Sequence, residues 1–203
     1  MAEKTINLDQ SSFLNAVYQA SGNSLEMRRQ FDEICEFHSV RSGERLFKQG
    51  EGFSTVTVNL DGLFRIYHEG AAENDELTIG FIKPGGTAPF MSAIKSDGEL
   101  NYSVESLVKA SIMTFPRPRF LELVESDIRW YRMIWNLLYE ENAHREKRER
   151  SLLVSSAYAR YQEFLTEFED TEHLIKLKYI ASYLGIQPAT LSRIRSSPYR
   201  GEV

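Results

Sequence analysis

The segment KLKYIASYLGIQPATLSRIRS, residues 176–196, contains two short helical patterns joined by a turn. Gly185 suits the end of the first helix, because glycine adopts the left-handed conformation without a Cβ penalty. Pro188 suits the first position of the second helix, where its missing N–H costs nothing. The small Ala181 allows the two helices to approach closely. Apolar residues at helical spacing give each helix one buried stripe: Ile180, Leu184, Ile186, Leu191 and Ile194. The segment therefore predicts a helix-turn-helix.

The second helix of this motif leaves small and hydrogen-bonding residues away from its apolar stripe. Such a helix fits the major groove of DNA, which is about 12 Å wide. We predict that this face reads bases and that nearby cations contact phosphates. The alternatives are a polar outer face on an ordinary helical hairpin and cations that are only solvated. The predicted base-reading residues are Gln187, Pro188, Ala189, Thr190, Ser192, Arg193 and Ser196, and the phosphate candidates are Lys176, Lys178 and Arg195.

Charge is distributed unevenly along the 203 residues, whose net charge is −5. From Thr171 onward five basic residues face two acidic ones, so this tail carries +3 and the remainder −8. A basic end on an acidic body favours specific DNA binding over indiscriminate coating of nucleic acid.

Cysteine use and hydropathy exclude several classes of protein. Cys35 is the only cysteine, so an internal disulfide, a structural zinc site and an iron–sulfur cluster are not expected. The polar start MAEKTINLDQ and the lack of an apolar run of roughly 20 residues predict no signal peptide and no membrane span. We therefore expect a cytoplasmic protein without a metal or cofactor.

Before the helix-turn-helix, the chain passes through three patterns. Residues 1–34 are typical of helices, with apolar faces around Phe13–Tyr18 and Leu25–Ile34. Short alternating segments separated by glycine then predict strands, at 55–60, 63–67, 77–82, 102–107 and 111–115. Turn signals lie at Ser42-Gly43, Gly50-Glu51-Gly52, Asp61-Gly62, Pro84-Gly85-Gly86 and Asp97-Gly98. Many short strands at regular spacing indicate a barrel or roll.

A long helix follows, capped by Ser126 or Asp127 and extending to about Leu153. One stripe of it has the spacing of a coiled-coil seam: Ile128, Tyr131, Trp135, Leu138 and Asn142, continuing through Arg145, Glu149 and Leu152. The apolar first half predicts a homodimer. The alternative is an amphipathic helix packed on its own roll.

This order of roll, long helix and helix-turn-helix resembles the Crp–Fnr family of bacterial transcription regulators along nearly the whole chain. The most specific matches are IASYLGI, residues 180–186, and TLSRI, residues 190–194. Arg160-Tyr161, SVRSGERLFKQG at residues 39–50 and Gly62-Leu63-Phe64-Arg65 also resemble family segments. The resemblance implies an α+β protein with a double-stranded β-helix (jelly-roll) sensor domain at 1–124, a dimerisation helix at 125–153 and a winged-helix-like DNA-binding domain at 154–203.

The resemblance also implies how DNA is bound. A homodimer would place two recognition helices in successive major grooves of a two-fold operator, about 34 Å apart, and RNA polymerase is a further candidate partner. Arg193 keeps a family position from which it can bind guanine bidentately. Ala189 stands where family members often have a glutamate, which puts the base opposite it in question.

In the sensor region this chain departs from cyclic-nucleotide-binding relatives. Pro89-Phe90 replaces their Gly-Glu pair, and Leu100-Asn101 replaces the Arg-Ser pair that grips the cyclic phosphate. Cyclic AMP is therefore not expected as the effector. We predict instead a pocket for an amphiphilic or anionic molecule, or alternatively a filled core. Its predicted lining is Phe90, Met91, Leu100, Asn101, Tyr102 and Arg145.

A different class of function, a cupin-like enzyme or small-molecule binder whose terminal helices only pack, fits the sequence less well. A metal cupin needs clustered histidines and a carboxylate, and the roll offers only His38 and His68 without a His-x-His pair. Haem ligation through His38, His68 or His144 has no supporting spacing. We therefore predict a protein that is not an enzyme.

Overall fold

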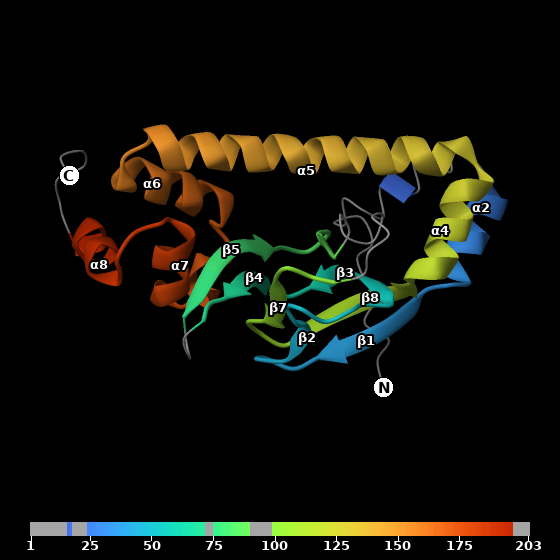
Figure 1. The fold of residues 1–203 in the computed structure, drawn as a ribbon, viewed down its shortest axis with the longest axis horizontal. Helices are drawn as coiled ribbons and strands as arrows, with labels where there is room; N and C mark the ends of the chain where they lie inside the picture. The colour runs from blue at the N-terminus through green and yellow to red at the C-terminus, as the bar shows by residue number, and fades with distance from the viewer. Residues whose placement is uncertain (1–15, 18–23, 72–74, 90–98, 197–203) are drawn as a thin grey trace.

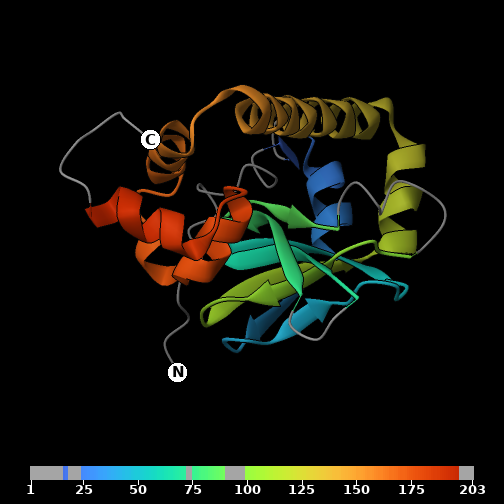
Figure 2. The same cartoon turned by 60° about the vertical axis from the view of Figure 1, so that its left-hand side comes forward.

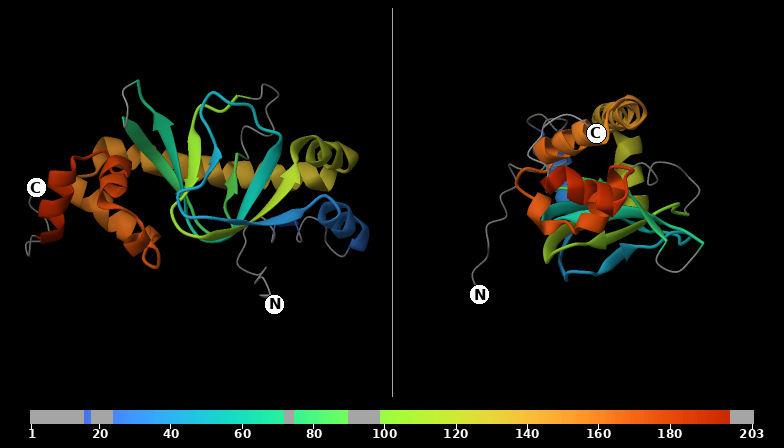
Figure 3. Two further views of the ribbon diagram at one scale, coloured as in Figure 1. Left: turned by 90° about the horizontal axis from the view of Figure 1, so that it is seen from below. Right: turned by 90° about the vertical axis from the view of Figure 1, so that its left-hand side faces the viewer.

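The computed structural model describes residues 16–17, 24–71, 75–89 and 99–196. A β-roll occupies the middle of the molecule, and the long helix α5 (Ile128–Val154) runs along one side of it (Figure 1). Helices α2 (Leu25–Asp32) and α4 (Arg117–Ser126) cover one end of the roll, and the C-terminal helices lie at the other (Figure 3). The order of elements is the α+β architecture expected from the sequence.

The roll consists of two four-stranded antiparallel sheets, as expected for a jelly roll. One sheet has the strand order β1-β8-β3-β6 and the other β2-β7-β4-β5. The strands are β1 (Glu36–Val40), β2 (Arg45–Phe47), β3 (Thr55–Asp61), β4 (Phe64–Glu69), β5 (Glu76–Ile82), β6 (Thr87–Ala88), β7 (Ser103–Ser106) and β8 (Ala110–Pro116). Each strand predicted from alternation is therefore present.

The turn at Asp61-Gly62 carries the chain from one sheet to the other. Strand β3 pairs with β6 and β8, whereas β4 pairs with β5 and β7. Gly62 has a φ of 113°, and a Cβ there would lie 2.6 Å from the Cβ of Ala110, so only glycine fits. The predicted turn at Asp97-Gly98 lies outside the described residues.

Helices α2, α4 and α5 close the roll over an aromatic core. Phe31, Phe115, Phe120 and Trp130 are fully buried there and pack ring against ring. Of the residues predicted on the first N-terminal face, Val17 is buried in this core, and Phe13, Leu14 and Tyr18 lie outside the described residues.

Asp127 caps the long helix α5. Its carboxylate accepts hydrogen bonds from the backbone N–H and the side chain of Arg129, which lower the pKa of Asp127 to about 2. The helix ends at Val154, within one residue of the predicted end.

The C-terminal part contains α6 (Ala157–Glu167), the short 3-10 helix η2 (Glu172–Leu174), α7 (Leu177–Tyr183) and α8 (Pro188–Ser196). Between residues 154 and 196 the structure has helices and turns without a strand, so the winged element expected there is not found in the part described. The predicted domain boundaries at 124 and 153 fall near the ends of α4 and α5 and stay a prediction. In the described segments, no helix combines the length and apolar character needed to cross a bilayer.

Candidate nucleic-acid interface and sensor cavity

The predicted helix-turn-helix is formed by α7 and α8. Gly185 takes a φ of +66° at the turn, and the Ile186 N–H donates to the Ala181 carbonyl at 3.0 Å. Pro188 is the first residue of α8, and the carbonyl of Gln187 accepts hydrogen bonds from the N–H groups of Thr190 and Leu191. Gly185 and Pro188 therefore have in the structure the roles that the sequence predicts for them, at the turn and at the start of the second helix.

The apolar stripes of the two helices pack into one core with α6. Ile180, Ala181, Leu191 and Ile194 are buried there against Phe164 and other residues of the same cluster. This core holds α8 by one side only, so the opposite side faces solvent.

The predicted base-reading residues lie together on that solvent face of α8. Gln187, Pro188, Ala189, Ser192, Arg193 and Ser196 are exposed, and Thr190 is half-buried. The exposed set combines a guanidinium with small side chains, so the backbone of α8 can enter a groove closely.

The predicted phosphate contacts divide into two kinds. Lys176 and Lys178 are exposed, with their Nζ atoms 5.7 and 4.9 Å from the centroid of the Tyr179 ring. Arg195 is also exposed, but its Nη2 lies 3.8 Å from an oxygen of Glu172. This carboxylate offsets part of the positive charge that Arg195 offers to a phosphate.

The outer side of α5 carries an exposed apolar stripe along its first half. Ile128, Tyr131 and Trp135 are 63%, 52% and 72% exposed. Leu138, predicted in this seam, instead packs partly against the protein's own core, and the neighbouring Tyr139 is 70% exposed. The stripe therefore continues through Tyr139, because the inward face of α5 follows Trp130, Met133, Ile134 and Leu137. The predicted Asn142 is exposed at the next turn, and so are Glu149 and Leu152 farther along.

A cavity of about 470 Å³ lies where the roll, α5 and the C-terminal helices meet. Of the residues predicted for an effector pocket, Asn101, Tyr102 and Arg145 line this cavity, and their role in binding an effector stays a prediction. Leu100 does not, because it is buried in the core of the roll. Phe90 and Met91 lie outside the described residues.

The cavity has further lining residues that the sequence analysis missed. Phe168 directly follows α6 and Tyr183 ends α7, whereas Ile66 and Phe81 belong to the sheet that faces them. The two groups of residues are separated by about a hundred residues along the chain, so no local sequence pattern predicts their contact. An aromatic residue within a helical stripe is ordinarily counted as core of its own domain.

Charged residues of α5 line the cavity and reach the C-terminal helices. His144 Nε2 lies 3.1 Å from Glu167, and Arg148 donates to the Tyr183 carbonyl at 3.0 Å while lying over the Tyr183 ring. Burial raises the pKa of Glu141, and the nearby Arg145 and His144 act in the opposite direction. Arg145 is exposed at the cavity, where its guanidinium interacts with Glu141 and can also be reached by a bound anion.

No group of histidine, cysteine and carboxylate residues in the described segments is placed to hold a metal ion. Burial raises the pKa of the Cys35 thiol to about 12, which keeps this cysteine protonated and unreactive at neutral pH. His38 contacts Thr114 and His68 contacts the Asn101 carbonyl, so each has a structural partner.

Comparison with known proteins places this geometry in context. Residues 37–127 match the family model of the cyclic nucleotide-binding domain. FixK2 from Bradyrhizobium japonicum aligns with a TM-score of 0.71 and 20% identity, covering 80% of this chain and 83% of that chain. The c-di-GMP-responsive global regulator CLP from Xanthomonas campestris aligns with a TM-score of 0.66 and 14% identity, covering 82% of this chain and 87% of that chain. The catabolite activator protein from Thermus thermophilus aligns with a TM-score of 0.53 and 17% identity, covering 87% of this chain and 84% of that chain.

A sequence comparison with curated proteins finds no match. At identities of 20% or less, the structural matches describe the fold of this chain. They extend beyond the sensor region, since each covers most of this chain. Residues 37–127 thus match the cyclic nucleotide-binding domain in sequence, and the chain shares the fold of Crp–Fnr transcription regulators over most of its length.

Proposed function

We propose that this protein is a homodimeric, sequence-specific DNA-binding transcription regulator of the Crp–Fnr type. The observation that carries this proposal is the face of α8, where predicted base-reading side chains are exposed together beyond a buried stripe. Regulators of this family bind DNA as dimers, and the two-fold operator predicted from the sequence follows from that symmetry. Its expected setting is the cytoplasm, with RNA polymerase as a further partner.

The exposed stripe of α5 supports the homodimer. Ile128, Tyr131, Trp135 and Tyr139 form an apolar face of the kind that is rare on a monomer and enriched in the centres of interfaces. We expect Trp135→Glu to raise the dimer dissociation constant at least about 30-fold, because a central tryptophan is worth about 2 kcal/mol or more.

Sedimentation velocity across a concentration series measures this dissociation constant. Asn136→Glu is the matched control, since it places the same charge on the adjacent exposed position beside the stripe. A monomeric wild-type protein at high micromolar concentration contradicts the dimer. An equal effect of both variants shows that the stripe is not the interface.

The DNA-binding proposal is tested by selecting bound duplexes from randomised DNA with the purified, ligand-free protein. We expect enrichment of an inverted repeat whose half-site centres are about one helical turn, 34 Å, apart. If no sequence is enriched either alone or with added effectors, the second reading of the sequence is favoured, in which a small-molecule-binding roll carries a helix-turn-helix that no longer reads DNA.

Arg193 and Ala189 are expected to set the preferred half-site. Arg193 can bind O6 and N7 of guanine, whereas the Ala189 methyl can only make an apolar contact, such as with thymine. We expect Ala189→Glu to shift the preference opposite this position toward cytosine, whose exocyclic amine donates to a carboxylate. Selection with this variant, beside selection with wild type, measures that shift.

We further propose that the cavity binds an effector other than cyclic AMP. Arg145 supplies a cation, Tyr102 and Phe81 supply apolar surface, and the volume of about 470 Å³ suits a small ligand. An amphiphilic carboxylate combines the required charge and apolar body. Titration calorimetry with hexanoate and benzoate, on wild type and Arg145→Gln, tests this. We expect heat from wild type only, and no heat from either acid with wild type contradicts this ligand class.

A further inference from the structure

Strand β5 is the edge of its sheet, and α7 of the helix-turn-helix covers that edge. The strand order β2-β7-β4-β5 leaves one side of β5 without a strand partner, and α7 packs on it (Figure 2). The N–H of Thr78, in β5, donates to Ser182 Oγ, in α7, at 2.9 Å. The helix-turn-helix is therefore attached directly to the sensor roll of its own chain.

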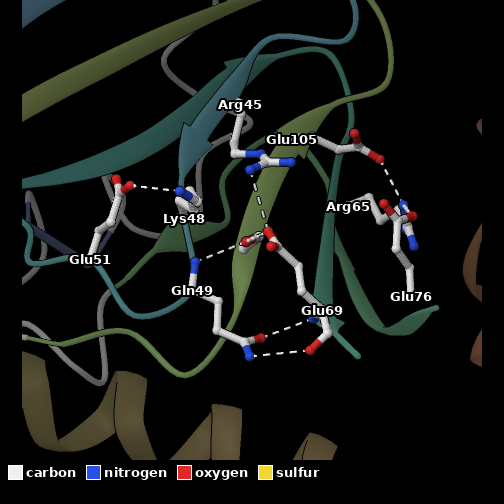
Figure 4. Close-up of polar contacts among 9 residues, drawn as sticks. Arg45, Lys48, Gln49, Glu51, Arg65, Glu69, Glu76 and Glu105 are labelled. Atoms are coloured by element: carbon white, nitrogen blue, oxygen red, sulfur yellow. Dashed lines mark hydrogen bonds and ion pairs between the residues drawn. The ribbon is translucent and has the colours of Figure 1, made fainter. Parts of the chain in front are cut away.

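Beneath this contact lies a buried arginine. The side chain of Arg65, in β4, is 1% exposed, and its Nη1 lies 2.7 Å from Glu76 and 2.8 Å from Glu105 (Figure 4). Its Nε donates to Thr78 Oγ1 at 2.9 Å. Two carboxylates and a hydroxyl thus stabilise a guanidinium that is otherwise costly to bury.

A tyrosine of α7 completes the cover of this guanidinium. The Cζ atom of Arg65 lies 3.8 Å from the centroid of the Tyr179 ring and 4.3 Å from that of Tyr67. Tyr67 belongs to the roll, whereas Tyr179 belongs to the helix-turn-helix. If α7 left the roll, the Arg65 group would lose one of its two aromatic faces and be exposed to water.

Two further contacts hold α7 in one orientation. Leu63 and Phe81 of the roll belong to the same apolar cluster as Ile180 and Tyr183. At the end of α7, Arg148 from α5 donates to the Tyr183 carbonyl, and Arg160 from α6 donates to the Leu184 carbonyl at 2.9 Å. These cations satisfy carbonyls that the end of a helix leaves without partners.

We propose that Arg65 is a positioning residue for DNA recognition. By holding Tyr179 and Thr78 together, it fixes α7, and with it the recognition helix α8, at a set orientation to the dimer helix α5. In a two-fold dimer this orientation determines the separation of the two recognition helices, and hence the half-site spacing that the protein accepts. This inference rests on the proposed function.

The first test measures amide hydrogen exchange in the ligand-free protein, which needs no DNA. We expect Arg65→Met to speed exchange of the Thr78 amide and of α7 at least about tenfold, since local opening frees both. Arg45→Met is the matched control, because Arg45 lies in β2, at the opposite edge of the same sheet, and forms an ion pair with Glu69 of β4 (Figure 4). Unchanged exchange in Arg65→Met overturns the claim that Arg65 holds α7.

A second variant guards against misfolding of the first. Tyr179→Leu leaves Arg65 and its carboxylates in place and removes only the aromatic cover from α7. We expect the same acceleration at Thr78 in this variant. Ser182→Ala removes only the acceptor of the Thr78 N–H, so its effect should stay confined to that amide.

The second test measures DNA binding on inverted repeats whose central spacer is lengthened or shortened by one and two base pairs. We expect wild type to prefer one spacing, and Arg65→Met to reduce that preference about tenfold while its affinity for a single half-site stays unchanged. A loss of stability alone would lower both affinities together. A spacing preference equal to that of wild type overturns the positioning role. If wild type binds no duplex, the proposed function fails, and hydrogen exchange alone then tests the attachment of α7.

Discussion

Helices α7 and α8 are neighbours of similar length, and each buries an apolar stripe in the same small core. Their remaining faces have different surroundings. In α7, Tyr179 and Ser182 contact the roll through Arg65 and Thr78. In α8, Pro188 and Arg193 project into solvent.

Under the proposed function, one motif separates support, by α7, from recognition, by α8. The face of α7 that touches the roll carries aromatic and buried groups, so a change there alters the stability of the fold. The corresponding face of α8 has no such contacts in the described residues, so a change there alters only what α8 binds. Substitutions in the two helices should therefore separate stability from DNA affinity.

The largest expected effect is on stability and comes from α7. Ile180 is fully buried, and we expect Ile180→Ala to lower the free energy of unfolding by about 2–5 kcal/mol, through lost burial and the cavity left behind. Urea unfolding followed by circular dichroism measures it. Ser192→Ala on the exposed face of α8 should change it by less than about 0.5 kcal/mol. Equal effects of the two substitutions contradict the contrast.

The next effect is the pH dependence contributed by Tyr183, at the end of α7. Burial first, and then the charge of Glu167, raise the pKa of Tyr183 to about 12. Because the folded state favours the protonated phenol, this contribution to stability is complete below pH 10 and is lost as the pH rises to 12. It amounts to about 2–3 kcal/mol.

Urea midpoints of wild type and Tyr183→Phe, compared at steps between pH 8 and pH 12, measure this contribution. The phenylalanine variant should lack the extra decline above pH 10. Parallel curves for the two proteins would show that Tyr183 ionises as freely when folded as when unfolded.

Arg193 provides the corresponding test on α8. We expect Arg193→Ala to lose about 1–3 kcal/mol of discrimination for its base at each half-site, and to relax the preference at one symmetric position. Its free energy of unfolding should remain within about 0.5 kcal/mol of wild type. Fluorescence anisotropy on matched operator variants, together with urea unfolding, checks both parts. If Arg193→Ala lowers the stability and leaves the base preference unchanged, α8 supports the fold rather than reading DNA, and the contrast between the two helices is contradicted.

The smallest effect is expected at the turn that joins them. Gly185 has a φ of +66°, and an added Cβ would meet only Leu152, at an ordinary contact distance of 3.5 Å. The cost of Gly185→Ala is therefore backbone strain of about 1–2 kcal/mol. Gly185→Asn should cost less, because asparagine tolerates this conformation better. Thermal unfolding of both variants measures the order, and a greater loss for asparagine contradicts it.

Much of the fold follows from local patterns in the sequence. Alternation predicts the strands because neighbouring side chains point to opposite faces of a sheet, and Asp127 and Pro188 mark where helices begin. Of the residues predicted to line an effector pocket, Asn101, Tyr102 and Arg145 lie at the cavity, whereas Leu100 lies in the core of the roll. The sequence does not distinguish the two environments for Leu100, because an apolar residue beside a turn is equally compatible with a core and with a pocket. The packing of the two sheets places it in the core.

The prediction of the exposed stripe on α5 is limited in the same way, because sequence alone does not say which apolar residues become buried. Leu138 and Tyr139 are adjacent and both apolar, and helical periodicity alone does not say which of them faces the roll. The winged element expected from family resemblance is not found between residues 154 and 196. That expectation came from resemblance rather than from strand signals in this part of the chain.

The helix-turn-helix and the exposed face of α8 follow from the sequence alone, because turn chemistry and helical periodicity act within a few residues. The packing of α7 against β5, with Tyr179 over Arg65, arises only when distant parts of the chain come together, and so does the lining of the cavity by Phe168 and Tyr183. These contacts join residues about a hundred positions apart. They depend on complementary shape and buried charge between the surfaces of the roll and of the C-terminal helices. No local sequence pattern predicts that complementarity.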